Sequence, residues 1–455
     1  MSSIERGPIV AKFGGSSLAD AERVKRVGEI VQQDPMRRFV VVSAPGKVNG
    51  EDEKVTDLLL ACHTLAEAEQ GSDFNKAFEQ VSSRYEQIGR GLAIHSSVVG
   101  WLDSVRKGIQ NGNGMDWTVS RGEWLMANTF ASFMGGSFAD AARLIRLQQN
   151  GQVDPITYQL IAEQLNGNNT LYVIPGFYGA ENRKKYWLFG PRAIKVFARG
   201  GSDITGAIVA RGVHARVYET WKDVDGLKAA DPRIVAHSKT IPHITYAEMR
   251  EMGYRGADVL QRDTVRPVYE VGIPIYIRNA SQASHPGTLI TRERVIAPHE
   301  SVIGIAGKEG FVSFQIDKFG MNEELGIAGK VLEIFQKHGV PFEHDPTGLD
   351  AMSVIVSEEH LNGKRDAIMH DLQAYVQPDR TSIIEGLGLV CVVGEGIARN
   401  KKATEVIDML AATLRDAGID IKTMSYRTAG SSIVIGVDNK DVCLAIKSLY
   451  NMFIR

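Results

Sequence analysis

The chain has 455 residues, of which 44% are hydrophobic and 23% charged, and its formal net charge is −2. This length predicts two to four domains rather than one. The small net charge gives no basic field for nucleic acid or a membrane surface, no apolar run is long enough to cross a bilayer, and the first residues contain no signal-peptide core. We therefore expect a cytoplasmic enzyme or regulator, with neither nucleic acid nor membrane as a partner.

The three cysteines, Cys62, Cys391 and Cys443, lie far apart in largely apolar surroundings. This spacing fits neither a disulfide framework nor a metal cluster. We expect all three to be buried free thiols.

The first predicted strand, residues 9–13, ends in a loop rich in small residues. That loop reads Gly14-Gly15-Ser16-Ser17 and leads into a helical pattern of apolar residues. Backbone N–H groups beside the positive end of a helix favour an anion, and Lys12 adds a cation. The loop lacks the spacing of both common phosphate motifs. The residues alone therefore leave a phosphate cradle and an ordinary strand-to-helix turn equally open.

A second buried-type strand over residues 38–47 ends in small residues, and residues 55–110 follow a helical pattern. Another helix opens at Ser120 and carries Glu123 in its first turn, where the helix dipole favours a carboxylate. Glu123 is therefore explained equally well as a ligand or as an ordinary helix-start residue.

A third apolar strand, residues 171–176, precedes a second Gly-Gly-Ser loop at Gly200-Gly201-Ser202. Next to it, Arg199 can clamp a carboxylate or phosphate with two hydrogen bonds. Asp203 can accept a substrate ammonium or help to hold Mg²⁺. Chance explains one such loop, whereas two among alternating strands and helices point to a shared anionic ligand.

The strand that begins at residue 216 becomes a polar loop over residues 222–233. A loop at the carboxyl end of a strand is the expected place for a nucleotide in an open α/β sheet, although a solvated loop is the simpler interpretation of this segment alone. A helix from residue 246 and a strand at 272–279 follow. The alternation predicts an α/β sandwich over residues 1–295.

The C-terminal part contains an internal repeat. A helix, a glycine stop and two strands occur twice, and the offset is 79 residues both from Gly339 to Gly418 and from Ser353 to Ser432. Each copy follows the β-α-β-β-α order of a ferredoxin-like unit. We expect these units at residues 300–386 and 387–455, with strand 301–306 completing the second unit so that the two interleave.

Taken together, the motifs resemble those of aspartate kinases, members of the amino-acid kinase family that carry two C-terminal ACT domains. The resemblance extends over essentially the whole chain. The motifs are Lys12-Phe13-Gly14-Gly15-Ser16-Ser17, Val42-Ser43-Ala44, Arg121-Gly122-Glu123, Arg199-Gly200-Gly201-Ser202-Asp203, Trp221-x-Asp223-Val224-x-Gly226, Ala230-Asp231-Pro232-Arg233 and Pro286-Gly287-Thr288.

The resemblance implies an amino-acid kinase-type α/β sandwich followed by two interleaved ferredoxin-like ACT domains. It also implies that ATP and Mg²⁺ are used to phosphorylate the β-carboxylate of L-aspartate. The product would be L-4-aspartyl phosphate, and the reaction the first step of lysine, threonine and methionine biosynthesis. By the same resemblance, Lys12 and Asp203 would be catalytic, and L-aspartate would be bound by Ser43, Glu123 and Arg199. The implied ATP contacts are Lys12, Phe13, Gly14, Gly15, Ser16, Gly201, Ser202, Lys222, Asp223, Gly226, Asp231 and Arg233.

The ACT domains imply an amino-acid effector, lysine or threonine, and a homodimer or homotetramer formed through these domains. The candidate effector residues are Met321, Ile327, Ala328, Phe342, Glu343 and Thr347. Turns flanking a βαβ core explain the same residues equally well.

The chain departs from the family pattern in two places. Many members have Thr at Lys222 and Lys at Asp258, so that Lys222 could replace a cation missing at Asp258. In the second ACT domain the usual Ser-Gln-Gly-Ser-Ser pattern is replaced by Ser425-Tyr426-Arg427-Thr428-Ala429-Gly430-Ser431-Ser432. Two alternatives stay open: a kinase for another amino acid, and a non-catalytic ACT-type amino-acid sensor.

Overall fold

The structure, a computed structural model, describes residues 7–165, 169–181, 193–197, 200–254, 260, 262–426 and 430–454. The chain divides into two compact units. The first comprises Met1–Leu227, Pro242–Tyr246 and Val259–Arg294, and the second comprises Lys228–Ile241, Ala247–Asp258 and Val295–Arg455. Two segments that precede residue 295 in the sequence thus group with the C-terminal unit.

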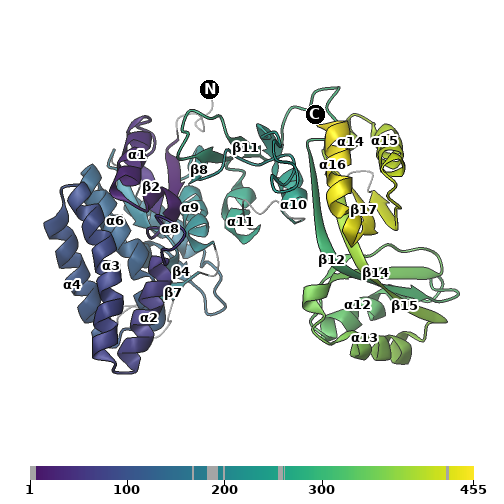
Figure 1. The fold of residues 1–455 in the computed structure, drawn as a ribbon, viewed down its shortest axis with the longest axis horizontal. Helices are drawn as coiled ribbons and strands as arrows, with labels where there is room; N and C mark the ends of the chain where they lie inside the picture. The colour runs from purple at the N-terminus through teal and green to yellow at the C-terminus, as the bar shows by residue number, and fades with distance from the viewer. Residues whose placement is uncertain are drawn as a thin grey trace. The chain divides into compact units, whose positions relative to one another are not determined.

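The first unit is built on an eight-stranded sheet with the order β3-β5-β2-β1-β8-β10-β11-β9 (Figure 1). Neighbouring strands are parallel except β10 and β11. The strands are β1 (Ile9–Phe13), β2 (Phe39–Val42), β3 (Ser137–Phe138), β5 (Tyr172–Pro175), β8 (Val217–Lys222), β9 (His243–Thr245), β10 (Ile275–Asn279) and β11 (Thr288–Thr291). A smaller sheet contains β4 (Arg146–Leu147), β6 (Tyr178–Glu181) and β7 (Ile194–Val196).

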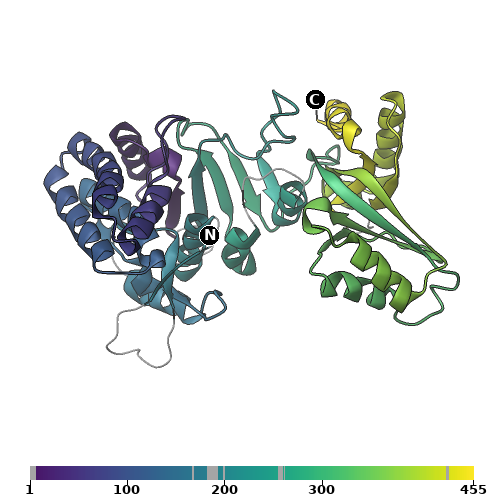
Figure 2. The ribbon, with the colours of Figure 1, turned by 60° about the horizontal axis from the view of Figure 1, so that its bottom comes forward.

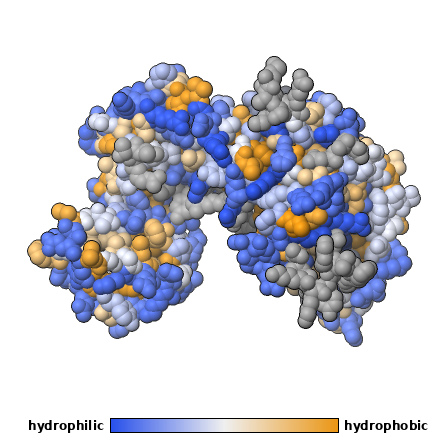
Figure 3. Space-filling model, turned by 180° about the vertical axis from the view of Figure 1, so that it is seen from behind, coloured by the Kyte–Doolittle hydropathy of each residue, from blue (hydrophilic) through white to orange (hydrophobic). Residues whose placement is uncertain are grey.

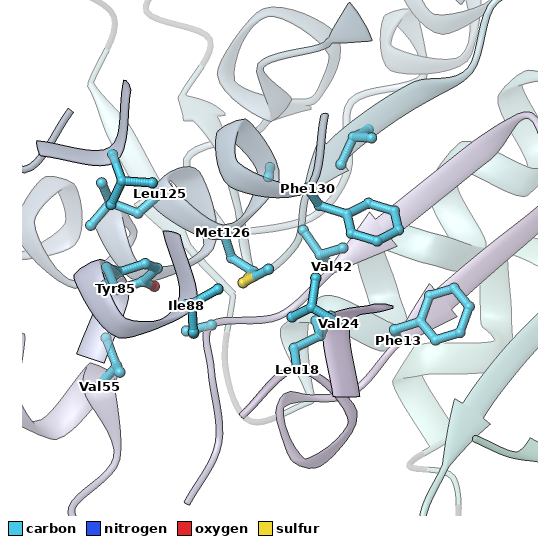
Figure 4. Close-up of a cluster of buried hydrophobic side chains, with 14 of the residues drawn as sticks. Phe13, Leu18, Val24, Val42, Val55, Tyr85, Ile88, Leu125, Met126 and Phe130 are labelled. Carbon is cyan, nitrogen blue, oxygen red and sulfur yellow. The ribbon is translucent and has the colours of Figure 1, made fainter. Parts of the chain in front are cut away.

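Helices cover the sheet and bury its apolar side chains. The helices of this unit are α1 (Ala21–Gln32), α2 (Val55–Glu67), α3 (Gly71–Gly91), α4 (His95–Gln110), α5 (Met115–Val119), α6 (Arg121–Met134), α7 (Ala141–Leu144), α8 (Ile156–Leu165), α9 (Gly201–Gly212) and α11 (Arg262–Val271). Side chains from α1, α2, α3, α4 and α6 form one buried cluster with Ala11, Phe13, Val40 and Val42 of the central strands (Figure 4). Helix α9 packs on β1, β2 and β8 and contacts α8 and α11. The predicted strands and helices of this part are confirmed.

The two faces of strands β1 and β8 carry different chemistry. Successive residues of a strand point to opposite faces, and Phe13 belongs to the core cluster, so Lys12 points away from it. The register pairs Lys12 with Thr220 and Phe13 with Trp221. Thr220 therefore shares the face of Lys12, whereas Trp221 shares the face of Phe13, with the two rings stacked at 5.8 Å between centroids.

A buried ion network lies on the Phe13 face of β8. The Glu219 carboxylate is 3% exposed and accepts hydrogen bonds from Arg37 Nε at 2.7 Å, Arg37 Nη2 at 3.2 Å and Trp221 Nε1 at 2.9 Å. Arg37 Nη1 also donates to the Ile30 carbonyl at 2.6 Å, and Arg278 Nη1 lies 3.6 Å from Glu219. The network joins α1, β8 and β10. Its hydrogen bonds and ion pairs compensate the charge of Glu219, which would otherwise be costly to bury.

The second unit contains one six-stranded antiparallel sheet with the order β13-β14-β12-β15-β17-β16 (Figure 2). Helix α10 (Tyr246–Tyr254) belongs to this unit except for its first residue. The other elements are β12 (Gly304–Asp317), α12 (Ile327–Lys337), β13 (Phe342–His344), β14 (Ala351–Ser357), α13 (Arg365–Asp371), β15 (Arg380–Val393), α14 (Gly396–Arg399), α15 (Ala403–Asp416), β16 (Thr423–Tyr426), β17 (Ser432–Asp438) and α16 (Val442–Phe453). The β-α-β-β-α repeat is confirmed, and the stop glycines Gly339 and Gly418 both have positive φ, at +63° and +71°.

The two repeats share their central strands. Residues 311–317 of β12 pair with β14 and with the first half of β15, whereas residues 304–308 pair with 389–393, the half of β15 that also pairs with β17. The register shifts between Lys308 and Ser313, and Gly310 there has φ +86°. Such a bulge is the expected way to bend a strand from one half-sheet into the next. The predicted interleaving is confirmed, although the first strand begins at Gly304 rather than Ser301.

On the face shown in Figure 3 both units present mostly hydrophilic side chains with small hydrophobic patches among them. Among the described helices, none combines the length and the apolar character needed to traverse a membrane.

Cys62 and Cys391 are buried as predicted, but Cys443 is exposed. The prediction for Cys443 was wrong because it is the second residue of α16, beside the buried Val442 rather than on the buried stripe.

We expect Glu219→Ala to destabilise the first unit by about 3–5 kcal/mol, because Arg37 would then keep a buried charge without its partner. Urea unfolding of the full chain measures this loss. The matched control is Glu22→Ala, which removes an exposed pair with Lys25 and should cost less than about 1 kcal/mol. Equal effects of the two variants would contradict the role assigned to the network.

Candidate active site

A compact ionic cluster lies at the carboxyl ends of β1 and β8. Lys12 Nζ is 2.9 Å from Asp203 Oδ1, and the Thr220 hydroxyl donates to the same oxygen at 3.1 Å. Lys222, two residues beyond Thr220 and hence on the same face of β8, places Nζ 3.4 Å from Asp203 Oδ2. The first turn of α9 supplies the carboxylate, and the two strands supply the cations.

The carboxylate of the cluster stays ionised despite burial. Burial by itself raises the pKa of Asp203, but the charges of Lys12 and Lys222, together with hydrogen bonds from Lys12 and Thr220, outweigh it and lower this pKa to about 2. Burial lowers the pKa of Lys222, and Asp203 opposes that change. The site therefore places two lysines around one ionised carboxylate, an arrangement suited to an anion.

Three close backbone approaches shape the loop after Lys12. The Gly14 N–H donates to the Trp221 carbonyl at 3.3 Å, and the Ser43 N–H donates to the Phe13 carbonyl at 3.2 Å. A Cβ on Gly15 would lie 2.6 Å from the Ala44 carbonyl oxygen. A side chain is therefore excluded at Gly15, where the loops that follow β1 and β2 touch backbone to backbone.

Helix α9 begins at the same edge of the sheet. Its N-cap, Gly200, has φ +84°, a backbone conformation that favours glycine. Within the described residues, no side chain caps its first turn. The N–H groups at Gly201 and Ser202 are thus placed as an uncapped, positive helix end, which favours an anion.

Glu123 is the unusual acid of the site. It lies in the first turn of α6, is 5% exposed, and its Oε2 is buried with no hydrogen-bond partner among the residues that the structure describes. Burial raises the pKa of Glu123 to about 7, although hydrogen bonds from the Ala44 and Glu123 backbones and the charges of Arg121 and Lys12 oppose this rise. A buried carboxylate oxygen with an open acceptor position is suited to a ligand that brings its own positive charge.

The sequence predicted Lys12, Asp203 and Lys222 as site residues, but not that both lysines contact the Asp203 carboxylate. Thr220 was not predicted, although the spacing of Thr220 and Lys222 on one strand face is a readable signal once β1 and β8 are neighbours. The Phe13 side chain is fully buried, so only its backbone is placed to meet a ligand. Ser16 and Ser43 are half-buried and Asp223 is exposed.

The remaining predicted nucleotide and substrate residues fall into three groups. Gly226 is buried with φ +118° in the loop after β8. Asp231 and Arg233 lie in the second unit, where the arginine Nη2 is 2.6 Å from the carboxylate. Arg199 lies outside the described residues, so its substrate role stays a prediction. Asp258, where the sequence predicts a missing cation rather than a contact, lies outside them too.

The predicted effector residues are split between core and surface. Met321 and Ile327 belong to the buried cluster of the first repeat, whereas the exposed members are Ala328, Phe342 and Thr347. Glu343 is half-buried, and burial raises its pKa to about 7. The effector role of these six residues stays a prediction.

Comparison with known proteins identifies the family. Residues 7–279 match the model of the amino acid kinase family. Aspartokinase 3 of Bacillus subtilis is 33% identical over 98% of this chain and 98% of its own length, and lysine-sensitive aspartokinase 3 of Escherichia coli is 25% identical over 98% of this chain and 99% of its own. The crystal structure of Clostridium acetobutylicum aspartate kinase, described as an allosteric enzyme, superimposes with a TM-score of 0.84 at 37% identity and covers 98% of this chain and all of that one.

The chain therefore belongs to the amino acid kinase family, whose model covers most of the first unit. Within that family it belongs to the aspartokinases, because the likeness extends through the C-terminal repeats in both sequence and structure. Membership of a kinase family implies the use of ATP.

We expect Glu123→Gln to be more stable than the parent at pH 8, in the absence of substrates. Between pH 4.5 and 7 the folded parent keeps a proton on Glu123 that the unfolded chain has lost, so its free energy of unfolding falls as pH rises through this window. The shift corresponds to roughly 3 kcal/mol. The difference between variant and parent should grow by that amount from pH 4 to pH 8 in urea unfolding.

Glu22→Gln, at an exposed position on α1, is the control and should show a nearly constant difference from the parent. A difference for Glu123→Gln that does not change with pH would mean that Glu123 ionises in the folded protein as easily as in the unfolded one.

Proposed function

We propose that the chain is an ATP- and Mg²⁺-dependent aspartate kinase that produces L-4-aspartyl phosphate. One observation carries the proposal. An anion site with two lysines, and a buried carboxylate with one oxygen that has no partner among the described residues, occur at the same edge of the eight-stranded sheet. Together they match a nucleotide phosphate and an amino acid, whereas either feature alone would fit many ligands.

The amino acid is positioned through its two α-substituents. The ammonium group of aspartate fits the open acceptor of Glu123, and its α-carboxylate is assigned to Arg199. The β-carboxylate then remains free to approach the phosphate, with Ser43 at the acceptor end. This arrangement explains why the site keeps a buried glutamate at a cost in stability.

The transfer needs no base from the protein. The β-carboxylate of aspartate is already ionised at neutral pH, and one of its oxygens forms a bond to the γ-phosphorus while the bond from that phosphorus to the bridging oxygen of ADP breaks. Lys12 and Lys222 reduce the repulsion between the two anions and stabilise charge on the transferred group. Catalysis then consists of alignment and charge neutralisation.

The residues fit a Mg²⁺ that arrives bound to the nucleotide. In the described part of the chain, no three His, Cys, Asp or Glu side chains are grouped so as to hold a metal ion, and Mg²⁺ in kinases is commonly bound by phosphates with one or two carboxylates. Asp203 is the carboxylate of the cluster that would approach it. When bound, Mg²⁺ neutralises charge on the phosphate oxygens.

We also propose that the C-terminal repeats are ACT domains that bind lysine or threonine and mediate assembly into a homodimer or homotetramer. The Escherichia coli relative is named lysine-sensitive, and the Clostridium acetobutylicum relative is described as allosteric. Inhibition of ADP release by added lysine or threonine tests the effector proposal. Rates unchanged by both would reject it.

An ADP-release assay over a panel of amino acids tests the substrate. We expect turnover with L-aspartate that is at least about tenfold faster than with L-glutamate, because an extra methylene displaces the acceptor carboxylate from the phosphate. Glutamate turnover without aspartate turnover would contradict the substrate, and no turnover with any acid would contradict a kinase.

We expect Lys12→Ala to lower kcat by about 10³-fold, because one of the two cations at the phosphate is removed. Folding should be retained, since Lys222 and Thr220 still contact Asp203. Initial rates at saturating substrates and thermal unfolding measure the two effects. Lys25→Ala, on the exposed side of α1, is the control, and near-normal turnover by Lys12→Ala would exclude the proposed charge neutralisation.

A further inference from the structure

Helix α3 carries none of the predicted site residues, yet two consecutive side chains on it reach the backbone of two segments of the site. Arg84 Nη1 donates to the Gly46 carbonyl at 2.9 Å, and the Tyr85 hydroxyl donates to the Gly122 carbonyl at 2.6 Å. Consecutive residues of a helix point about 100° apart. One turn of α3 therefore contacts two separate segments, one after β2 and one at the start of α6.

Arg84 closes the segment that follows Ser43. Its Nη2 lies 3.1 Å from Asp52 Oδ2, which also accepts the Val48 N–H at 2.8 Å. The Arg84 and Asp52 side chains are only 14% and 25% exposed. A cleft of about 710 Å³ lies where residues 48–53 meet α3. Arg84 therefore ties this segment to α3 through two contacts beside that cleft.

Gly46 connects the segment held by Arg84 to the loop that follows Lys12. The Gly46 N–H donates to the Gly15 carbonyl at 2.8 Å. A Cβ on Gly46 would lie 2.7 Å from the Gly15 carbonyl carbon. The two backbones are therefore in direct contact, and displacement of Gly46 would displace the loop that follows Lys12.

Tyr85 performs the corresponding role for Glu123. Its ring is fully buried in the core, near Ile88, Val55 and Leu125 (Figure 4). Burial raises the pKa of the Tyr85 hydroxyl, and the charge of Glu123 raises it further, so the hydroxyl stays a donor. Its acceptor, Gly122, directly precedes Glu123, and a Cβ on Gly122 would lie 2.8 Å from Cβ of Ala44.

We propose that Arg84 and Tyr85 are positioning residues for the two substrates separately: Arg84 acts through Gly46 on the nucleotide, and Tyr85 acts through Gly122 and Glu123 on the amino acid. This inference rests on the proposed function. It predicts that a change at Arg84 affects the KM for ATP, whereas a change at the adjacent Tyr85 affects the KM for aspartate. General destabilisation of the protein would not separate the two constants in this way.

The experiment compares Arg84→Ala and Tyr85→Phe with the parent in steady-state kinetics and in calorimetric binding of ADP. Loss of one buried anchoring contact should raise the KM for ATP and the Kd for ADP about tenfold in Arg84→Ala, with the KM for aspartate changed less than about twofold. Tyr85→Phe should show the reverse pattern.

Matched variants separate positioning from folding. Arg90→Ala removes an exposed pair with Glu86 on the same helix and should leave both KM values at the parental level. Arg84→Lys should restore part of the ATP affinity, because one ammonium cannot reproduce both contacts of the guanidinium.

Two results would overturn the inference. One is an unchanged ADP affinity in Arg84→Ala. The other is an equal rise of both KM values in either variant, in parallel with a lowered Tm. If the parent binds ADP but phosphorylates no amino acid, the proposed function is contradicted. The proposed role of Arg84 would still be tested, because it is measured by ADP binding.

Discussion

The register between β1 and β8 is the constraint on which the site depends. It places Lys12 beside Thr220 on one face and Phe13 beside Trp221 on the other. A shift by one residue would exchange the faces: it would bring Trp221 to Asp203 and place a lysine in the core. Burial of Phe13 and Trp221 on the apolar face allows a single register between β1 and β8. That register in turn fixes where Lys12 and Lys222 lie on the polar face.

Both faces of these strands hold buried charge, but with different consequences. Glu219 has its donors within the protein, so its network stabilises the strand order. Glu123 keeps an oxygen that has no partner in the described part of the chain, which is unfavourable until a ligand supplies a donor. Proteins commonly retain such a feature only where function requires it. The contrast supports the proposed role of Glu123, rather than Glu219, in binding a substrate.

Sequence reasoning could find the strands, the two glycine loops and the repeat, because apolar periodicity and glycine spacing are local signals. It could not show that Lys12 and Lys222 share one carboxylate, since β1 and β8 are about 200 residues apart along the chain. The same limit hid Arg84 and Tyr85, which look like ordinary helix residues in sequence. The exposed Cys443 was missed because burial within an amphipathic helix depends on a single residue step.

The repeats of the second unit share β12 and β15, so they form one sheet rather than two independent domains. Each half lies along a different part of the same two strands, and the bulge near Gly310 marks the change from one half to the other. Neither half can separate without breaking the pairing that completes its neighbour. A ligand bound to one half must therefore act on a strand that the other half also uses, because pairing along a continuous strand resists independent motion.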